Sequence, residues 1–479
     1  MRHHSSIYIA LLTLVLLVVL PFAVCAEDAS MTAEDMLQRG LQYYKGDGVE
    51  QDDALAAQWF EKAADLGNAE AMLHLGVMYE LGSGVEQNDV LAVQWFQKAA
   101  DLDNTSAMNS LGWMYILGDG VEQNDELGVQ WVQKAADLGN TDAMSNLGFM
   151  YVWGIGVEQN EELAAQWYQK AADLGDMYAM ANLGGLYEDG RGVPQSYELA
   201  IEWYQKAAEL GDTDIMLLLG HMYDSRYDFG IGEEKNDELA VQWYQKAADL
   251  GDPNAMSCLA MMYRYGSGVP TNVELAFQLF QKAAEMDNTD AMVEIGKLYR
   301  FGTGVPQNGE LAVQWFEKAA DLGSSYAMYC LGDMYRYGTS VPQNGELAIQ
   351  WYQKAADMDD SDAMTSLGEM YFEGTGVPQD EAVAFEWFEK AADLGNADAM
   401  NYLGIMYFDG TGVSKDEKLG IQWLQKAADL NNDKAMVNLG VMYLMGISVP
   451  QDKELGIQWL QKAADLGSGE AWAILSEIQ

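Results

Sequence analysis

Three arginines recur at intervals of 36 residues and have the chemistry to bind an anionic or extended ligand. They are Arg264, Arg300 and Arg336, and an aromatic residue directly follows each one: Tyr265, Phe301 and Tyr337. Six arginines occur after residue 26, so this row holds half of them. A planar guanidinium can hold a carboxylate through two hydrogen bonds and can stack on an aromatic ring. The row therefore indicates a site for partner binding.

Two other interpretations of the row stay open. A repeat duplication could have copied one harmless arginine, or each guanidinium could pair with acidic neighbours. Beside the row, residues 224–235 lengthen a loop by four residues and supply three further candidates, Arg226, Tyr227 and Phe229. Long loops of repeat proteins often carry function, although a neutral insertion is an equal alternative.

The sequence offers little for catalysis. His74 and His221 lie in different registers of the repeat and four repeats apart, so they are poorly placed to share a site. The motifs of serine hydrolases, zinc proteases and phosphate-binding or dinucleotide-binding loops do not occur. The acidic run 357–362 lacks the Gly and the terminal Glu of a calcium loop. We therefore predict no catalytic residue, no metal site and no cofactor.

These candidates belong to an internal repeat that runs through the chain. One Trp recurs every 36 residues, with Leu279 in one vacancy and a single step of 40 between Trp203 and Trp243. A marker Tyr keeps the same spacing and the same jump, from Tyr43 to Tyr443. Such a period is typical of stacked supersecondary units, so we expect one elongated domain over 27–479 rather than several globular ones.

One repeat, residues 68–103, predicts two helices joined by a glycine turn. Apolar residues from Ala71 to Tyr79 lie on one helical stripe, and the run 82–85 breaks this first helix, helix A. A second helix, helix B, begins near Asn88, and a lysine recurs near its end in all twelve copies. The residues expected on its buried face are Leu91, Trp95, Phe96, Ala99 and Leu102.

Helix A varies at the position two residues before the marker Tyr, whereas helix B is nearly constant. This variation is what a tailored binding groove would show. The residues at this position in different repeats are Trp113, Phe149, His221, Lys297, Asp333 and Glu369.

The repeat pattern resembles the Sel-one-like repeat (SLR) family, relatives of the tetratricopeptide repeats. The pattern is Ala-Met-x-x-Leu-Gly-x-Met-Tyr, then Gly-x-Gly-Val, then Leu-Ala-x-Gln-Trp-Tyr-Gln-Lys-Ala-Ala-Asp-Leu-Gly. The resemblance implies an all-α, right-handed α/α superhelical solenoid of about twelve 36-residue helix-turn-helix repeats. It also implies scaffold or adaptor proteins that bind partners on the concave surface lined by helices A. We expect a C-terminal capping helix over 471–478.

The first 26 residues resemble a cleaved signal peptide. Arg2 precedes an apolar run over 7–20, and small residues suited to cleavage end at Ala26. This predicts a secreted or periplasmic protein with no membrane span in the mature chain, and a segment retained as an uncleaved signal anchor is the alternative. The remaining cysteines, Cys258 and Cys330, lie two repeats apart, too far for a disulfide, so we expect two buried free thiols.

After removal of residues 1–26, 25 Lys and Arg face 74 Asp and Glu, a formal net charge of −49. Such a charge disfavours nucleic acid and anionic membranes as partners. We predict a monomeric extracytoplasmic scaffold that binds a protein or peptide, either basic or with exposed carboxylates. A structural repeat protein associated with a glycan or envelope polymer is the alternative, and a hydrolase is least favoured.

Overall fold

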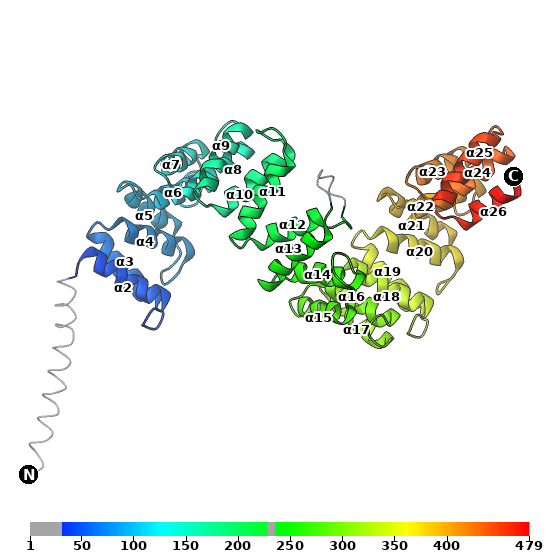
Figure 1. The fold of residues 1–479 in the computed structure, drawn as a ribbon, viewed down its shortest axis with the longest axis horizontal. Helices are drawn as coiled ribbons and strands as arrows, with labels where there is room; N and C mark the ends of the chain where they lie inside the picture. Colours follow the sequence, from blue (N-terminus) through cyan, green and yellow to red (C-terminus); the bar gives the residue numbers. More distant parts are fainter. Residues whose placement is uncertain (1–30, 228–234, 479) are drawn as a thin grey trace, which may run out of the picture. The chain divides into compact units, whose positions relative to one another are not determined.

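A computed structural model describes residues 31–227 and 235–478 of the chain, and in this part of the chain the regular structure is entirely helical. Figure 1 shows the helices following one another as stacked pairs. The 25 described helices are α2 (Ala33–Lys45), α3 (Asp53–Asp65), α4 (Ala69–Leu81), α5 (Asp89–Ala100), α6 (Thr105–Leu117), α7 (Asp125–Asp137), α8 (Thr141–Trp153), α9 (Glu161–Asp173), α10 (Met177–Asp189), α11 (Tyr197–Glu209), α12 (Thr213–Tyr223), α13 (Asp237–Asp249), α14 (Pro253–Tyr265), α15 (Val273–Ala284), α16 (Thr289–Phe301), α17 (Gly309–Asp321), α18 (Ser325–Tyr337), α19 (Gly345–Ala356), α20 (Ser361–Glu373), α21 (Glu381–Asp393), α22 (Ala397–Asp409), α23 (Glu417–Asp429), α24 (Asp433–Met445), α25 (Lys453–Asp465) and α26 (Gly469–Ile478).

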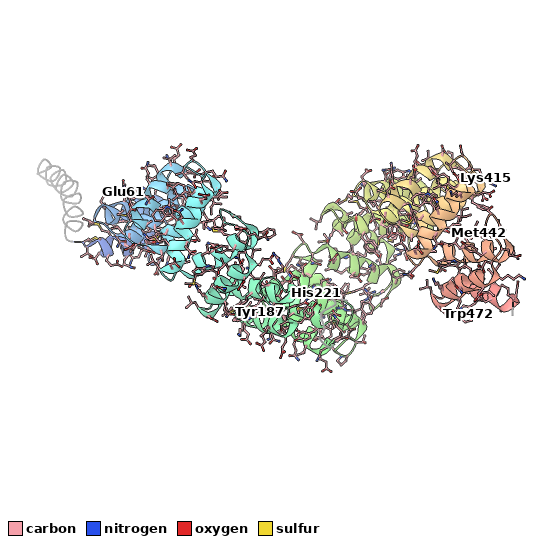
Figure 2. All side chains as sticks on the ribbon, turned by 90° about the horizontal axis from the view of Figure 1, so that it is seen from above. Glu61, Tyr187, His221, Lys415, Met442 and Trp472 are labelled. Atoms are coloured by element: carbon pink, nitrogen blue, oxygen red, sulfur yellow. The ribbon has the colours of Figure 1, made fainter. Side chains whose placement is uncertain are left out.

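The helices alternate as the repeat predicts. Even-numbered helices up to α24 are helices A, and odd-numbered ones are helices B. The predicted all-α solenoid of twelve repeats is confirmed, and the handedness of its superhelix stays a prediction. The last helix, α26, packs on α25, and Trp472 on it is 57% exposed (Figure 2).

The described residues fall into two compact units, divided between Lys235 and Asn236. The first unit contains α2–α12 and the second contains α13–α26. The predicted signal peptide, residues 1–26, lies outside the described residues, and its cleavage and the secreted location stay predictions. No helix in the described ranges has the length and apolar character needed to cross a bilayer.

Each helix A begins and ends with a cap that the sequence encodes. In α6, the side-chain oxygen of Asn104 accepts a hydrogen bond from the backbone N–H of Ala107 at 2.8 Å. This satisfies one of the N–H groups that a helix start leaves unpaired. The helix ends at Gly118, whose φ of 77° lies in the left-handed region that glycine adopts most easily. In most repeats a small polar residue and a glycine therefore set where helix A begins and ends, whereas α12 ends at Asp224 without a glycine.

The core lies between helices A and B of each repeat. Phe96 of α5 is fully buried against Gly76 of α4, and a Cβ atom on Gly76 would lie 2.4 Å from the Phe96 ring. A side chain larger than hydrogen at this position would force the Phe96 ring to shift. The prediction that Leu102 is buried is wrong, because α5 ends at Ala100 and Leu102 lies in the following turn, 51% exposed.

The constant lysine of helix B has a structural contact. In the second repeat, Lys98 places its ammonium group 3.8 Å from the ring centre of Trp95, and the other repeats that carry the Trp show the same arrangement. A cation over an indole ring is attracted by the ring quadrupole. The lysine row therefore belongs to the scaffold.

Among the described residues, Cys258 and Cys330 form no disulfide. Cys330 is buried, as predicted, whereas Cys258 is half-buried, so the prediction of full burial is wrong for Cys258.

Candidate binding surface

The three arginines and three aromatic residues lie in one row at the carboxyl ends of α14, α16 and α18, which we call the arginine–aromatic row. Each aromatic residue is the last residue of its helix, and a left-handed glycine follows it: Gly266, Gly302 and Gly338. Each guanidinium carbon lies 5.1–5.2 Å from the centre of the neighbouring ring. The three rings are exposed by 57%, 61% and 60%, so each repeat presents one aromatic surface.

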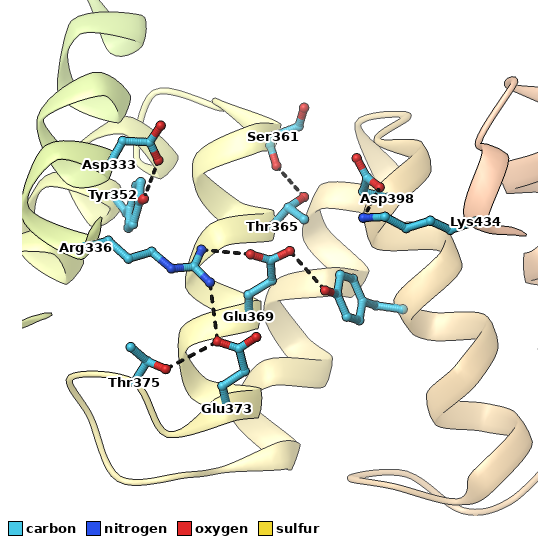
Figure 3. A network of polar contacts seen from close by, with 11 residues as sticks. Asp333, Arg336, Tyr352, Ser361, Thr365, Glu369, Glu373, Thr375, Asp398 and Lys434 are labelled. Carbon is cyan, nitrogen blue, oxygen red and sulfur yellow. Dashed lines mark hydrogen bonds and ion pairs between the residues drawn. The ribbon is translucent and has the colours of Figure 1, made fainter. Parts of the chain in front are cut away.

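Two of the three arginines bind glutamates of the next repeat. Arg264 forms an ion pair with Glu294 of α16. Arg336, only 6% exposed, binds Glu369 at 2.8 Å and Glu373 at 3.5 Å, both on α20 (Figure 3). These ion pairs link successive helices A. The acidic neighbours considered in the sequence are therefore the partners of Arg264 and Arg336.

Arg300 differs from the other two. Its side chain makes no ion pair with any described residue, and its Nε atom is buried without a hydrogen-bond partner. Arg264 pairs with Glu294 of the following repeat. In the repeat that follows Arg300, the position equivalent to Glu294, 36 residues later, is Cys330. The position equivalent to Glu369, the partner of Arg336, is Asp333. Its carboxylate accepts a hydrogen bond from the Tyr352 hydroxyl at 2.7 Å (Figure 3). Arg300 therefore has no glutamate at either position where Arg264 and Arg336 have one.

Lys297 lies one helical turn before Arg300 on α16. Its ammonium group lies 2.8 Å from Glu294 and 4.7 Å from the centre of the Tyr326 ring. Burial alone would lower the pKa of Lys297, but the hydrogen bond and charge of Glu294 raise it above its ordinary value. Lys297 is therefore cationic and shares Glu294 with Arg264.

The lengthened loop begins in the first unit. α12 ends at Tyr223, and the fully buried Asp224 accepts hydrogen bonds from the Arg226 backbone and side chain at 2.9 Å. Tyr227 packs against His221, with ring centres 4.6 Å apart. Phe229 lies outside the described residues. The structure gives Arg226 and Tyr227 local contacts within their own unit.

Sequence reasoning missed a second row in the first unit. The column that holds the three aromatic residues in the second unit holds Leu81, Leu117 and Trp153 in α4, α6 and α8, exposed by 65%, 62% and 67%. Phe149 connects Trp113 to Trp153, with ring centres 6.5 Å and 6.2 Å apart. Alignment of the repeats places these residues in the same column as Tyr265, Phe301 and Tyr337, but only the part of the column that follows an arginine was chosen as a candidate.

The histidines show no sign of a shared site. His74 stacks on Phe60, with ring centres 4.9 Å apart, and burial lowers the pKa of both His74 and His221. Within residues 31–227 and 235–478, no three His, Cys, Asp or Glu side chains converge as metal ligands would.

The chain was compared with protein families, curated proteins and solved structures. The Sel1 repeat model matches twelve segments in succession, from 33–68 to 433–468, with one short break at residue 177 and another at 213–215. The curated proteins give no match.

Two solved structures are similar over most of the chain. A protective antigen of uropathogenic Escherichia coli strains with an SLR fold is 35% identical, covers 88% of this chain and 91% of its own, and has a TM-score of 0.58. A Sel1 repeat protein from Oxalobacter formigenes is 30% identical, covers 67% of this chain and 93% of its own, and has a TM-score of 0.55. With the twelve consecutive repeats, these matches show that the chain belongs to the Sel1 repeat family.

Proposed function

We propose that this protein is an extracytoplasmic scaffold that binds a protein or peptide on the concave surface of helices A, with repeats six to nine as the contact zone. Solenoids of this family serve in general as protein-interaction scaffolds. The observation that carries the proposal is an exposed aromatic ring at the end of helix A in three successive repeats: Tyr265, Phe301 and Tyr337. Tyrosine and arginine, along with tryptophan, are enriched at the energetic centres of protein interfaces.

The packing of the helices supports the choice of surface. Helices A of adjacent repeats contact one another directly at α6–α8, α8–α10 and α18–α20. No two helices B of the described repeats pack this closely. Closer approach of helices A within a unit is what an inner, concave position requires.

The leader-like residues 1–26 and the similarity to a protective antigen of E. coli support an extracytoplasmic location. An antigen that protects must be reachable by the host. The large negative charge fits a long solenoid that must stay soluble at high local concentration.

Affinity capture followed by a binding measurement tests this function. Residues 27–479 would be used to capture partners from the native envelope and secreted fractions, and each captured protein would then be purified. We expect a triple variant, Tyr265→Ser, Phe301→Ser and Tyr337→Ser, to weaken binding of the true partner at least ~30-fold, because each ring supplies a large apolar contact. Circular dichroism should be unchanged, since the rings are exposed.

The matched control is a triple variant of the other row, Leu81→Ser, Leu117→Ser and Trp153→Ser, which removes equally exposed apolar side chains from the first unit. Binding that is lost only in the second-unit variant supports the proposed zone. Equal affinity of both variants and the parent protein contradicts it. Retention on envelope polysaccharide without any protein partner would instead support the glycan-associated alternative.

A further inference from the structure

We infer that Arg300 is a receptor for a carboxylate of the partner, held beside the exposed ring of Phe301. This inference rests on the proposed function, because it names the chemistry that the partner brings to the same row. The ligand class is a peptide segment with a carboxylate next to an apolar side chain.

The first step is the state of the Arg300 guanidinium. It carries a full positive charge and five N–H donors, and none of them meets an acceptor among the described residues. Of its nitrogen atoms, only Nε is both fully buried and unpartnered, so Nη1 and Nη2 keep some contact with solvent. A carboxylate approaching these two atoms end-on can form two parallel charge-assisted hydrogen bonds.

The second step is the local charge. Glu294 is already bound by Arg264 and Lys297, and Arg300, further along α16, has no carboxylate of its own among the described residues. Asp333, on the facing helix, is occupied by Tyr352. These three cations, Arg264, Lys297 and Arg300, are set against two carboxylates, Glu294 and Asp333, so positive charge is in local excess in a chain whose formal net charge is −48. An incoming carboxylate would complete the pairing that Glu294 and Glu369 provide in the neighbouring repeats.

The third step is rigidity. The backbone carbonyl of Arg300 accepts hydrogen bonds from Gln307 at 2.9 Å and from the Ser340 hydroxyl at 3.4 Å, and Gln307 also donates to Ser340 at 2.8 Å. Two turns of successive repeats therefore hold the end of α16. The guanidinium carbon rests 5.2 Å from the centre of the Phe301 ring, which is 61% exposed. A binding group held in place in this way loses little freedom when a ligand arrives.

The small number of arginines allows a direct test. Residues 27–479 contain six arginines, so the protein labelled with ¹⁵N-arginine gives six Nε–H signals, and the Arg300→Lys variant identifies the one from Arg300. Three dipeptides would be titrated at about 0.15 M salt, where distant charges are screened beyond ~8 Å. N-acetyl-Gln-Phe presents a terminal carboxylate, N-acetyl-Glu-Phe-amide presents a side-chain carboxylate, and N-acetyl-Gln-Phe-amide presents none.

We expect the Arg300 signal to shift saturably with one or both acids and not with the neutral dipeptide. The signals of Arg264 and Arg336 should stay fixed, because their guanidinium groups are already paired. The acid that acts at lower concentration identifies the source of the carboxylate. The inference is overturned if the Arg300 signal does not move, or if all three signals move alike.

A designed variant provides the matched control. Cys330→Glu places a carboxylate at the position that Glu294 occupies one repeat earlier, where the fold accepts a side chain that is 12% exposed. It should satisfy Arg300 internally and raise the concentration needed for the shift at least tenfold. The Arg300→Gln variant, followed by fluorescence anisotropy with labelled N-acetyl-Glu-Phe-amide, gives the same comparison if Cys330→Glu fails to fold. A response that persists unchanged in these variants contradicts the inference.

This test can fail separately from the proposed function. Loss of partner binding in the aromatic triple variant with no response at Arg300 would leave the scaffold function standing and remove the carboxylate site. A response at Arg300 together with partner binding that neither triple variant weakens would support a carboxylate site at Arg300 and contradict the proposed contact zone.

Discussion

The two units use the same column of helix A for different chemistry. In the first unit the column exposes Leu81, Leu117 and Trp153, and the residues before them are Glu80, Ile116 and Val152. In the second unit it exposes three rings, each preceded by an arginine. The scaffold around both columns is alike, with buried Phe96 and Phe316 in corresponding places. The comparison teaches that the repeat fixes where a side chain is presented, whereas single substitutions decide what it can bind.

The largest effect should come from breaking the scaffold that the units share. Phe96→Ala and Phe316→Ala each remove a fully buried ring, and each should cost about 3–5 kcal/mol, because the cavity between helices A and B cannot close. Amide hydrogen exchange should show the loss near α4–α5 for the first variant and near α16–α17 for the second. Because each repeat mainly contacts its neighbours, we expect the other unit to keep its protection. A simultaneous loss in both units would contradict this independence.

A smaller effect should separate the arginines within the second unit. Arg336→Gln removes a buried guanidinium and leaves the half-buried Glu369 and the exposed Glu373 without their cation, which should destabilise α18–α20 by about 1–3 kcal/mol. The same change at Arg300 removes no ion pair, so its free energy of unfolding should stay within about 0.5 kcal/mol of the parent. Thermal unfolding and hydrogen exchange of the two variants provide the comparison. Equal destabilisation would show that Arg300 has a structural partner.

The smallest effect concerns Glu80, which occupies in the first unit the column that Arg264 occupies in the second. Burial, aided by the charges of Asp89 and Asp119, raises the pKa of Glu80 above its ordinary value. A carboxyl whose pKa is raised in the folded state favours folding when protonated, and this contribution is lost as the pH rises through that pKa. Glu80→Gln should therefore raise the unfolding midpoint at pH 7.

The advantage of Glu80→Gln should shrink as the pH falls through the raised pKa of Glu80 and should be largely gone at about pH 4, below which the parent carboxyl is protonated in both states. Denaturant titrations of the parent and the variant at pH 4 and pH 7 measure the difference. A gain of equal size at both pH values would show that the charge of Glu80 is not its cause.

The arrangement of elements was predictable from the sequence because it depends on local, repeated chemistry. Asn104 and Gly118 mark the ends of a helix by their own hydrogen bonding and backbone preference, and Gly76 predicts a close helix contact. Leu102 escaped prediction because the helix ends at Ala100, so the apolar stripe of α5 no longer fixes the direction of this side chain. The half-burial of Cys258 escaped for a related reason, since neighbouring side chains control how far solvent reaches.

The sequence by itself determined the twelve repeats, the two helices in each and the column in which the arginines and rings lie. Only the tertiary structure decided which arginine is available. Arg264, Arg300 and Arg336 are equivalent in sequence, but the partners of Arg264 and Arg336 lie on the next helix A, 30 to 37 residues away. Where that helix offers Glu294 or Glu369 the charge is neutralised, and where it offers Cys330 the charge of Arg300 stays unpaired. An ion pair depends on two side chains meeting in space, and one repeat read alone contains only one of them.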